Sequence, residues 1–124
     1  MEVITVNSVA FAYLGDAIYE LEIRKYLINK GLVKVNDMQN EAIKYVSAES
    51  QASYLKKLLD KNIFNEEELE VIKNARNSKI HSKPKSCDVL TYKHATALEA
   101  LFGYYYLNNN YGKIEDLVEI ITSM

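Results

Sequence analysis

Residues that break helices are rare in this chain, and their scarcity limits the folds available to it. The 124 residues include only four glycines and one proline. Long segments between them repeat apolar residues at a spacing near 3.6 residues, which is the period of an α-helix. The pattern predicts an all-α fold, a bundle of about six helices.

Capping residues set the expected limits of these helices. Asn7 or Ser8, Ser47 and Asn65 can each accept hydrogen bonds from the N–H groups of a first helical turn, and Gly31 suits a helix end. The acids that follow Asn65 suit the positive end of a helix. The expected helices cover about residues 8–29, 37–46, 48–59, 66–76, 91–108 and 113–122, and the longest connection is the polar segment 77–90.

Size and composition indicate one globular domain over residues 1–124. Hydrophobic residues make up 48% of the chain and charged residues 26%, which are the proportions of an ordinary soluble protein. The apolar stretches 9–14 and 97–107 are shorter than the roughly 18 residues that a membrane span needs. The single Cys87 cannot form an internal disulfide, and residues 1–3 do not resemble a secretory leader. We therefore expect a cytoplasmic protein.

Two acids interrupt the apolar pattern of the first expected helix. This helix has apolar stripes on two roughly opposite sides, which predicts a buried, central position. The stripes are Phe11, Leu14, Ile18 and Leu21, and Val9, Ala12, Ile23 and Leu27. Asp16 falls within the second stripe, and Glu20 follows one turn later on the same face. Because a dry, unpaired carboxylate is very unfavourable, Asp16 must have a partner.

Glu99 interrupts the most apolar stretch of the sequence, in the fifth expected helix. Its neighbours one turn away are the small residues Ala95, Thr96 and Gly103. This face can therefore lie close against another helix, and Gly15 gives the first helix the same property. If the two helices meet there, Asp16 and Glu99 form an oxygen-rich site that suits Mg²⁺ or Mn²⁺.

A purely structural role is the alternative for both acids. Glu99 could meet a tyrosine hydroxyl, Lys93 or His94, and Asp16 could pair with Arg24 or with a neighbouring helix. Spacing alone, before any resemblance is considered, favours this structural interpretation.

Two segments of the chain resemble the catalytic domain of ribonuclease III. Residues 7–20, Asn-Ser-Val-Ala-Phe-Ala-Tyr-Leu-Gly-Asp-Ala-Ile-Tyr-Glu, are similar to the signature helix of that family, whose core is Leu-Gly-Asp followed by a small residue. Residues 96–103, Thr-Ala-Leu-Glu-Ala-Leu-Phe-Gly, look like its second acidic segment, and the order and separation of the segments also fit. The resemblance covers nearly the whole chain and includes no double-stranded-RNA-binding domain. The chain is therefore most similar to the short Mini-III branch, which matures ribosomal RNA in bacteria.

The chain departs from the common family pattern at two positions. Ordinary members have Glu where this chain has Ala12 and Asp where it has Thr96, so two of four metal-site carboxylates are absent. The Mini-III branch resembles this chain at both positions. The resemblance implies that Asp16 and Glu99 are the catalytic pair and hold the Mg²⁺ that activates water for attack on a phosphodiester.

Glu20 lies one turn after Asp16, and the sequence leaves two roles open for it. It is a candidate outer-shell acceptor at the metal site. The alternative is an exposed ion pair with Arg24 at i+4.

The segment from residue 73 to residue 85 reverses the acidic balance of a chain whose net charge is −2. It contains no acid, and its basic residues are Lys73, Arg76, Lys79, Lys83 and Lys85. Basic and polar side chains hold A-form duplexes through phosphate and 2′-OH groups, so this segment is the candidate surface for double-stranded RNA. A solvated surface without a ligand is the alternative.

An aromatic residue just before Leu-Gly-Asp commonly packs into the partner subunit in this family. The resemblance therefore implies a homodimer with Tyr13 at the interface and with Val9 and Phe11 as further candidates. Two-fold symmetry would place two active sites along one duplex.

Together, the residues and the resemblance predict a Mg²⁺-dependent endoribonuclease that cuts double-stranded RNA and leaves 5′-phosphates. The expected substrate is a precursor of large-subunit (23S) ribosomal RNA, which an accessory ribosomal protein could present. The alternative, which Ala12 and Thr96 favour, is a helical RNA-binding or ribosome-assembly module without catalysis. A plain helical scaffold would not explain the paired acidic motifs.

Overall fold

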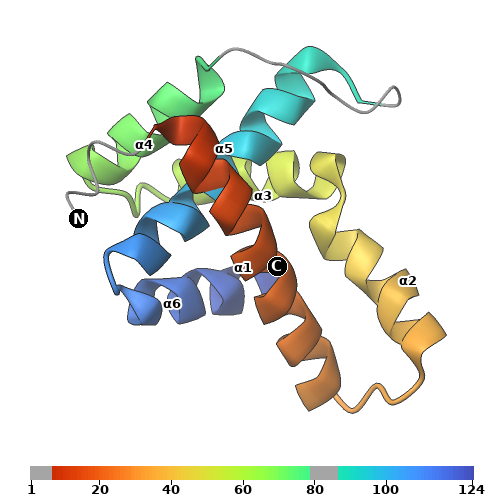
Figure 1. Cartoon of the computed structure of the whole chain (residues 1–124). Coiled ribbons are helices and arrows are strands. Elements are labelled where there is room, and N and C mark those ends of the chain that lie inside the picture. The colour runs from red at the N-terminus through yellow and green to blue at the C-terminus, as the bar shows by residue number, and fades with distance from the viewer. Residues whose placement is uncertain (1–6, 79–86) are drawn as a thin grey trace.

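The structure is a computed structural model that describes residues 7–78 and 87–124, and these residues form six helices (Figure 1). The helices are α1 (Ser8–Asn29), α2 (Val35–Val46), α3 (Ala48–Asp60), α4 (Glu66–Arg76), α5 (Val89–Leu107) and α6 (Tyr111–Thr122). The predicted all-α fold is confirmed. Within the described ranges, no helix is both long enough and apolar enough to cross a bilayer.

The predicted caps of α1, α3 and α4 are confirmed. Asn7 accepts a hydrogen bond from the backbone N–H of Ala10 at 2.9 Å, and Ser47 accepts one from Ser50 at 3.2 Å. Asn65 and Glu68 form a reciprocal capping box at the start of α4. Gly31 ends α1 with φ of +100°, a left-handed conformation that glycine adopts without steric cost.

Three helices begin earlier than the sequence pattern predicts. The structure starts α2 at Val35, α5 at Val89 and α6 at Tyr111. For α5 the reason is Asp88, whose side chain accepts a hydrogen bond from the Thr91 N–H at 2.8 Å and so caps the helix before the apolar pattern begins. The other two helices begin without a side-chain cap, which leaves no sequence signal for their first residue.

The central helix of the bundle is α5, which packs against α1, α3, α4 and α6. Its buried residues are Ala95, Ala97, Leu98, Ala100, Leu101, Phe102, Gly103 and Tyr105. The prediction that α1 is buried along two stripes is wrong, although α1 also packs against four helices, α2, α4, α5 and α6. Its buried residues form a single row, which consists of Phe11, Ala12, Gly15, Tyr19, Ile23 and Leu27. Val9 and Leu21 are exposed, because only one side of α1 faces the bundle.

The backbones of α1 and α5 touch where the two helices cross (Figure 1). A Cβ atom on Gly15 would lie 1.6 Å from the carbonyl oxygen of Glu99, and one on Gly103 would lie 2.0 Å from the carbonyl oxygen of Phe11. No side chain fits in either place. The predicted close approach is confirmed, and it brings Asp16, the residue after Gly15, to the position of Glu99.

Candidate active site

Asp16 and Glu99 interact across the contact between α1 and α5. Burial of Glu99 raises the pKa of its carboxyl, and the charge of Asp16 and a hydrogen bond with Asp16 raise it further, from 4.5 to about 8. Asp16 itself is exposed, because it lies beside the buried row of α1 and not within it. One carboxyl group is therefore held partly inside the bundle while the other is open to solvent.

No basic side chain among the described residues neutralises either acid. In residues 7–78 and 87–124 the ion pairs within one helix join Arg24 to Glu20, Lys25 to Glu22 and Lys44 to Glu41, and none reaches Asp16 or Glu99. Two side chains of the kinds that a structural role would pair with Glu99, a histidine and a tyrosine, have other partners. His94 contacts the carbonyl of Leu90 at 3.0 Å, and the hydroxyl of Tyr19 donates to the carbonyl of Tyr45 at 2.7 Å. Like charges gathered without a cation favour a bound divalent ion.

Gln51 from α3 is a third member of this site, and the sequence interpretation missed it. Its side chain is buried, with 4% exposed. The amide nitrogen Nε2 donates to the carbonyl of Val46 at 2.9 Å, and a hydrogen bond from the side chain lowers the pKa of Glu99. A signal was present in the sequence, because Gln51 shares the helical face of Leu55 and Leu58, both of which are buried.

The oxygen donors of the site fit a divalent ion. In the described part of the chain, Oε1 of Gln51 has no hydrogen-bond partner although it is buried. Carboxylate and amide oxygens are the ligands that Mg²⁺ and Mn²⁺ take in proteins. No group of three or more His, Cys, Asp and Glu side chains among these residues has a metal-binding arrangement. The oxygen donors that come together here are those of Asp16, Glu99 and the amide of Gln51.

Glu20 has the partner that the alternative interpretation gave it. Its carboxylate lies 3.1 Å from the Arg24 guanidinium on the same helix, and both side chains are largely exposed. Its charge nonetheless contributes to the raised pKa of Glu99, as the smallest of the causes. Glu20 therefore borders the acidic pair without converging on it.

The two positions at which this chain lacks an acid of the common family pattern have structural roles here. Ala12 is buried in the face of α1 that packs on the bundle. The hydroxyl of Thr96 donates to the carbonyl of Tyr92 at 2.9 Å, within α5 itself. Neither residue supplies an oxygen to the acidic pair.

The expected RNA-binding and interface residues fall into different environments. Lys73 is exposed and Arg76 is half-buried in the last turn of α4, whereas Lys79, Lys83 and Lys85 lie outside the described residues. Among the expected interface residues, Tyr13 is 85% exposed and Val9 is 46% exposed. Phe11 lies in the core of its own chain, with its ring edge-on to Tyr104 at 5.9 Å, so an interface would rest on Tyr13 and Val9.

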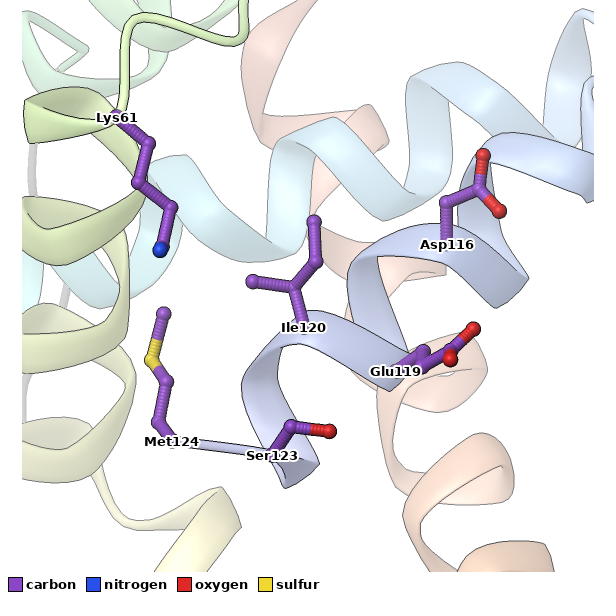
Figure 2. A pocket seen from close by; sticks show the side chains of 6 residues that line it. All are labelled: Lys61, Asp116, Glu119, Ile120, Ser123 and Met124. Atoms are coloured by element: carbon purple, nitrogen blue, oxygen red, sulfur yellow. The ribbon is translucent and has the colours of Figure 1, made fainter.

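Two surface hollows lie outside the Asp16–Glu99 pair. One, of about 500 Å³, separates α1 from α2, has a mainly apolar lining and reaches Glu20. The other lies between Lys61 at the end of α3 and the last turns of α6 (Figure 2). There the Lys61 amine points toward Ile120 and Met124, while the carboxylates of Asp116 and Glu119 point away from it. Neither hollow gathers groups able to catalyse a reaction.

Comparison with known proteins identifies the family. The model of the ribonuclease III domain matches residues 9–110. The chain therefore belongs to the ribonuclease III family and is an endoribonuclease. The relatives named Mini-ribonuclease 3 include a Streptococcus pneumoniae protein, 41% identical over 95% of this chain and 92% of that protein, and a Brevibacillus brevis protein, 47% identical over 93% and 82%. The crystal structure of a Fusobacterium nucleatum protein superposes with a TM-score of 0.84 at 37% identity and covers 95% of this chain and 93% of that one.

Proposed function

We propose that this endoribonuclease cleaves double-stranded RNA at Asp16 and Glu99 with the help of bound Mg²⁺, which Mn²⁺ can replace. Enzymes of the ribonuclease III family use a divalent metal and act on double-stranded RNA. The main support in this chain is the meeting of two carboxyl groups that no basic side chain in residues 7–78 and 87–124 neutralises, with the pKa of Glu99 raised to about 8 by burial and by Asp16. A structural pair of acids would be expected to have a cation or a hydroxyl group beside it.

Each residue of the site has a distinct task in this proposal. When bound, a divalent ion supplies an activated water and offsets the charge that develops on the phosphate. Glu99 is held in place because its helix touches the backbone of Gly15. Asp16, being exposed, is the carboxylate that an RNA duplex can approach from solvent. The products would carry 5′-phosphates and 3′-hydroxyls.

The same proposal assigns RNA binding and dimerisation to surfaces outside the acidic pair. Lys73 and Arg76, with Lys79, Lys83 and Lys85, would hold phosphates of the duplex. Tyr13 and Val9, both exposed on α1, would form the centre of a homodimer interface. The likeness to Mini-ribonuclease 3 proteins supports a precursor of 23S ribosomal RNA as the substrate, with the cytoplasm as the compartment and an accessory ribosomal protein as a further partner.

Cleavage of a labelled RNA duplex tests this function. The parent protein should cut the duplex with Mg²⁺ and leave it intact with a chelator. Asp16→Asn and Glu99→Gln should each lower turnover by at least about a hundredfold, the scale on which one lost electrostatic contact reduces catalysis, and should still bind RNA. Asp60→Asn and Glu115→Gln are matched controls on exposed acids and should cleave normally. Binding without cleavage by the parent would favour the non-catalytic RNA-binding module.

A further inference from the structure

Two tyrosines are almost fully buried in the described residues, Tyr19 on α1 and Tyr105 on α5, and each has 1% of its surface exposed. The hydroxyl of Tyr105 donates to Glu68 and so joins α5 to α4. The hydroxyl of Tyr19 donates to the carbonyl of Tyr45 at 2.7 Å, near the end of α2. Phenylalanine would serve apolar packing alone, whereas a buried hydroxyl needs a partner. Each hydroxyl is therefore a specific tie between two helices.

The ring of Tyr19 also joins α1 to α5. It packs against the ring of Phe102 with the two ring centroids 5.1 Å apart, and Phe102 is itself fully buried. Tyr19 lies three residues after Asp16 on α1, and Phe102 lies at the same spacing after Glu99 on α5. Residues three apart are neighbours on the surface of a helix. The ring contact therefore lies next to the place where the two acids meet.

We propose that Tyr19 is a positioning residue for the acidic pair: held through its ring by α5 and through its hydroxyl by α2, it fixes the rotation of α1 that turns Asp16 toward Glu99. The inference rests on the proposed function of these two acids. The backbone contact at Gly15 sets how closely α1 and α5 approach, but glycine has no side chain that could oppose a rotation of α1. Binding sites need their ligands held to about 0.5 Å by side chains that packing locks in place, and Tyr19 is locked at both ends.

Mn²⁺ affinity, measured from the electron paramagnetic resonance signal of free Mn²⁺, tests the assignment without relying on catalysis. Tyr19→Phe keeps the ring and removes the tie to α2, whereas Tyr19→Leu removes both the ring contact and the tie. Tyr19→Leu should bind Mn²⁺ about 10- to 100-fold more weakly than the parent, the range for residues that orient metal ligands, and the affinity of Tyr19→Phe should lie between the two. At saturating Mn²⁺ the KM for duplex RNA should stay at the parent value, because neither variant alters the basic segment.

Tyr105→Phe is the matched control, because it removes the hydroxyl of an equally buried tyrosine that ties α5 to α4. It should lower the unfolding temperature, as Tyr19→Phe should, without changing Mn²⁺ affinity. Parent-like affinity in either folded Tyr19 variant would overturn the inference and leave the proposed function in place. An equal loss of affinity in Tyr105→Phe would also overturn it, since the effect would then follow from lost stability. If the parent binds no Mn²⁺ that Asp16→Asn abolishes, the proposed function itself fails, and the inference with it.

Discussion

Glu68 on α4 and Glu99 on α5 differ in the groups that surround their carboxylates. Glu68 is the more buried of the two, with 3% exposed, yet it receives a backbone N–H and the Tyr105 hydroxyl as donors. Glu99 is only partly buried, yet it faces Asp16 and, more weakly, Glu20. Burial also raises the pKa of Tyr105, and its hydrogen bond to Glu68 adds to that rise.

The contrast shows which property of a buried acid indicates function. The hydrogen bonds of Glu68 join the start of α4 to α5 and satisfy both carboxylate oxygens, so they stabilise the fold. The acids around Glu99 repel one another with no compensating cation in the described part of the chain, and this repulsion lowers stability unless an ion binds. Glu68, the more deeply buried acid, is the structural one. Depth of burial therefore does not indicate function, whereas the identity of the neighbouring groups does.

Removing the close helix contact should have the largest effect, because it separates Glu99 from Asp16 while leaving Glu68 in place. In Gly15→Ala the new Cβ would lie 1.6 Å from the Glu99 carbonyl oxygen. The helices must move apart, so we expect a loss at or above the upper end of the about 1–3 kcal/mol typical of overpacking. Urea unfolding measures this loss. Gly112→Ala, which meets no atom within 4 Å, is the matched control, and parent-like stability of Gly15→Ala would contradict the contact.

Removing the donor to Glu68 should destabilise the fold by less. Tyr105→Phe leaves a buried carboxylate oxygen without its hydroxyl partner, and such a loss typically costs about 1–3 kcal/mol. Chemical denaturation of this variant should show that cost, while Mn²⁺ affinity stays at the parent value. Tyr106→Phe changes an exposed tyrosine one residue further along α5 and should leave stability unchanged. A drop in Mn²⁺ affinity in Tyr105→Phe would mean that the two glutamate sites are coupled.

Neutralising Glu99 should stabilise the metal-free protein, whereas the two preceding substitutions should destabilise it. Its pKa is about 8 in the folded chain and 4.5 for the ordinary carboxyl, so the folded state binds the proton more tightly and stability falls as pH rises from about 4.5 to 8. Glu99→Gln removes this dependence. Its unfolding temperature should therefore exceed that of the parent at pH 8 and approach it near pH 5. Mg²⁺ should raise the unfolding temperature of the parent only, and a lower unfolding temperature for the variant at pH 8 would support a structural role.

The smallest effect on stability is expected from the basic segment, which lies away from both glutamates in the sequence. Replacing Lys79, Lys83 and Lys85 by Ala should weaken duplex binding. It should also flatten the slope of log affinity against log salt by roughly two units, at about 0.7–0.9 per phosphate contact. Fluorescence anisotropy at several salt concentrations measures both quantities. An unchanged slope with full affinity would place the RNA on another surface.

The sequence predicted the helices from local signals, whereas spacing alone left the meeting of Asp16 with Glu99 open and the resemblance to the ribonuclease III family supported it. Caps such as Asn7 and Asn65 act within one turn, and glycine at position 15 indicates close packing wherever the partner helix lies. The signals for α2 and α6 were weaker, since neither helix has a side-chain cap at its start.

The burial of Gln51 and of Glu68 was harder to predict from the sequence. Both lie on the apolar face of an amphipathic helix, where Gln51 aligns with Leu55 and Glu68 with Ile72, but polar side chains are usually exposed. Only the packing of α3 and α4 against α5 shows what they contact. The burial of one side of α1, in place of the two sides that its apolar pattern predicts, likewise depends on the whole bundle and not on the pattern of one helix.

Whether Asp16 and Glu99 together hold a divalent ion can be seen in a crystal structure of the protein grown with Mn²⁺. We expect an anomalous-scattering peak with oxygen ligands from both carboxylates, at the crossing of α1 and α5. The peak should disappear in Glu99→Gln crystals grown in the same way. A Mn²⁺ peak found only elsewhere, or a Glu99 carboxyl neutralised by a lysine, arginine or histidine, would show that these two acids are not a metal site.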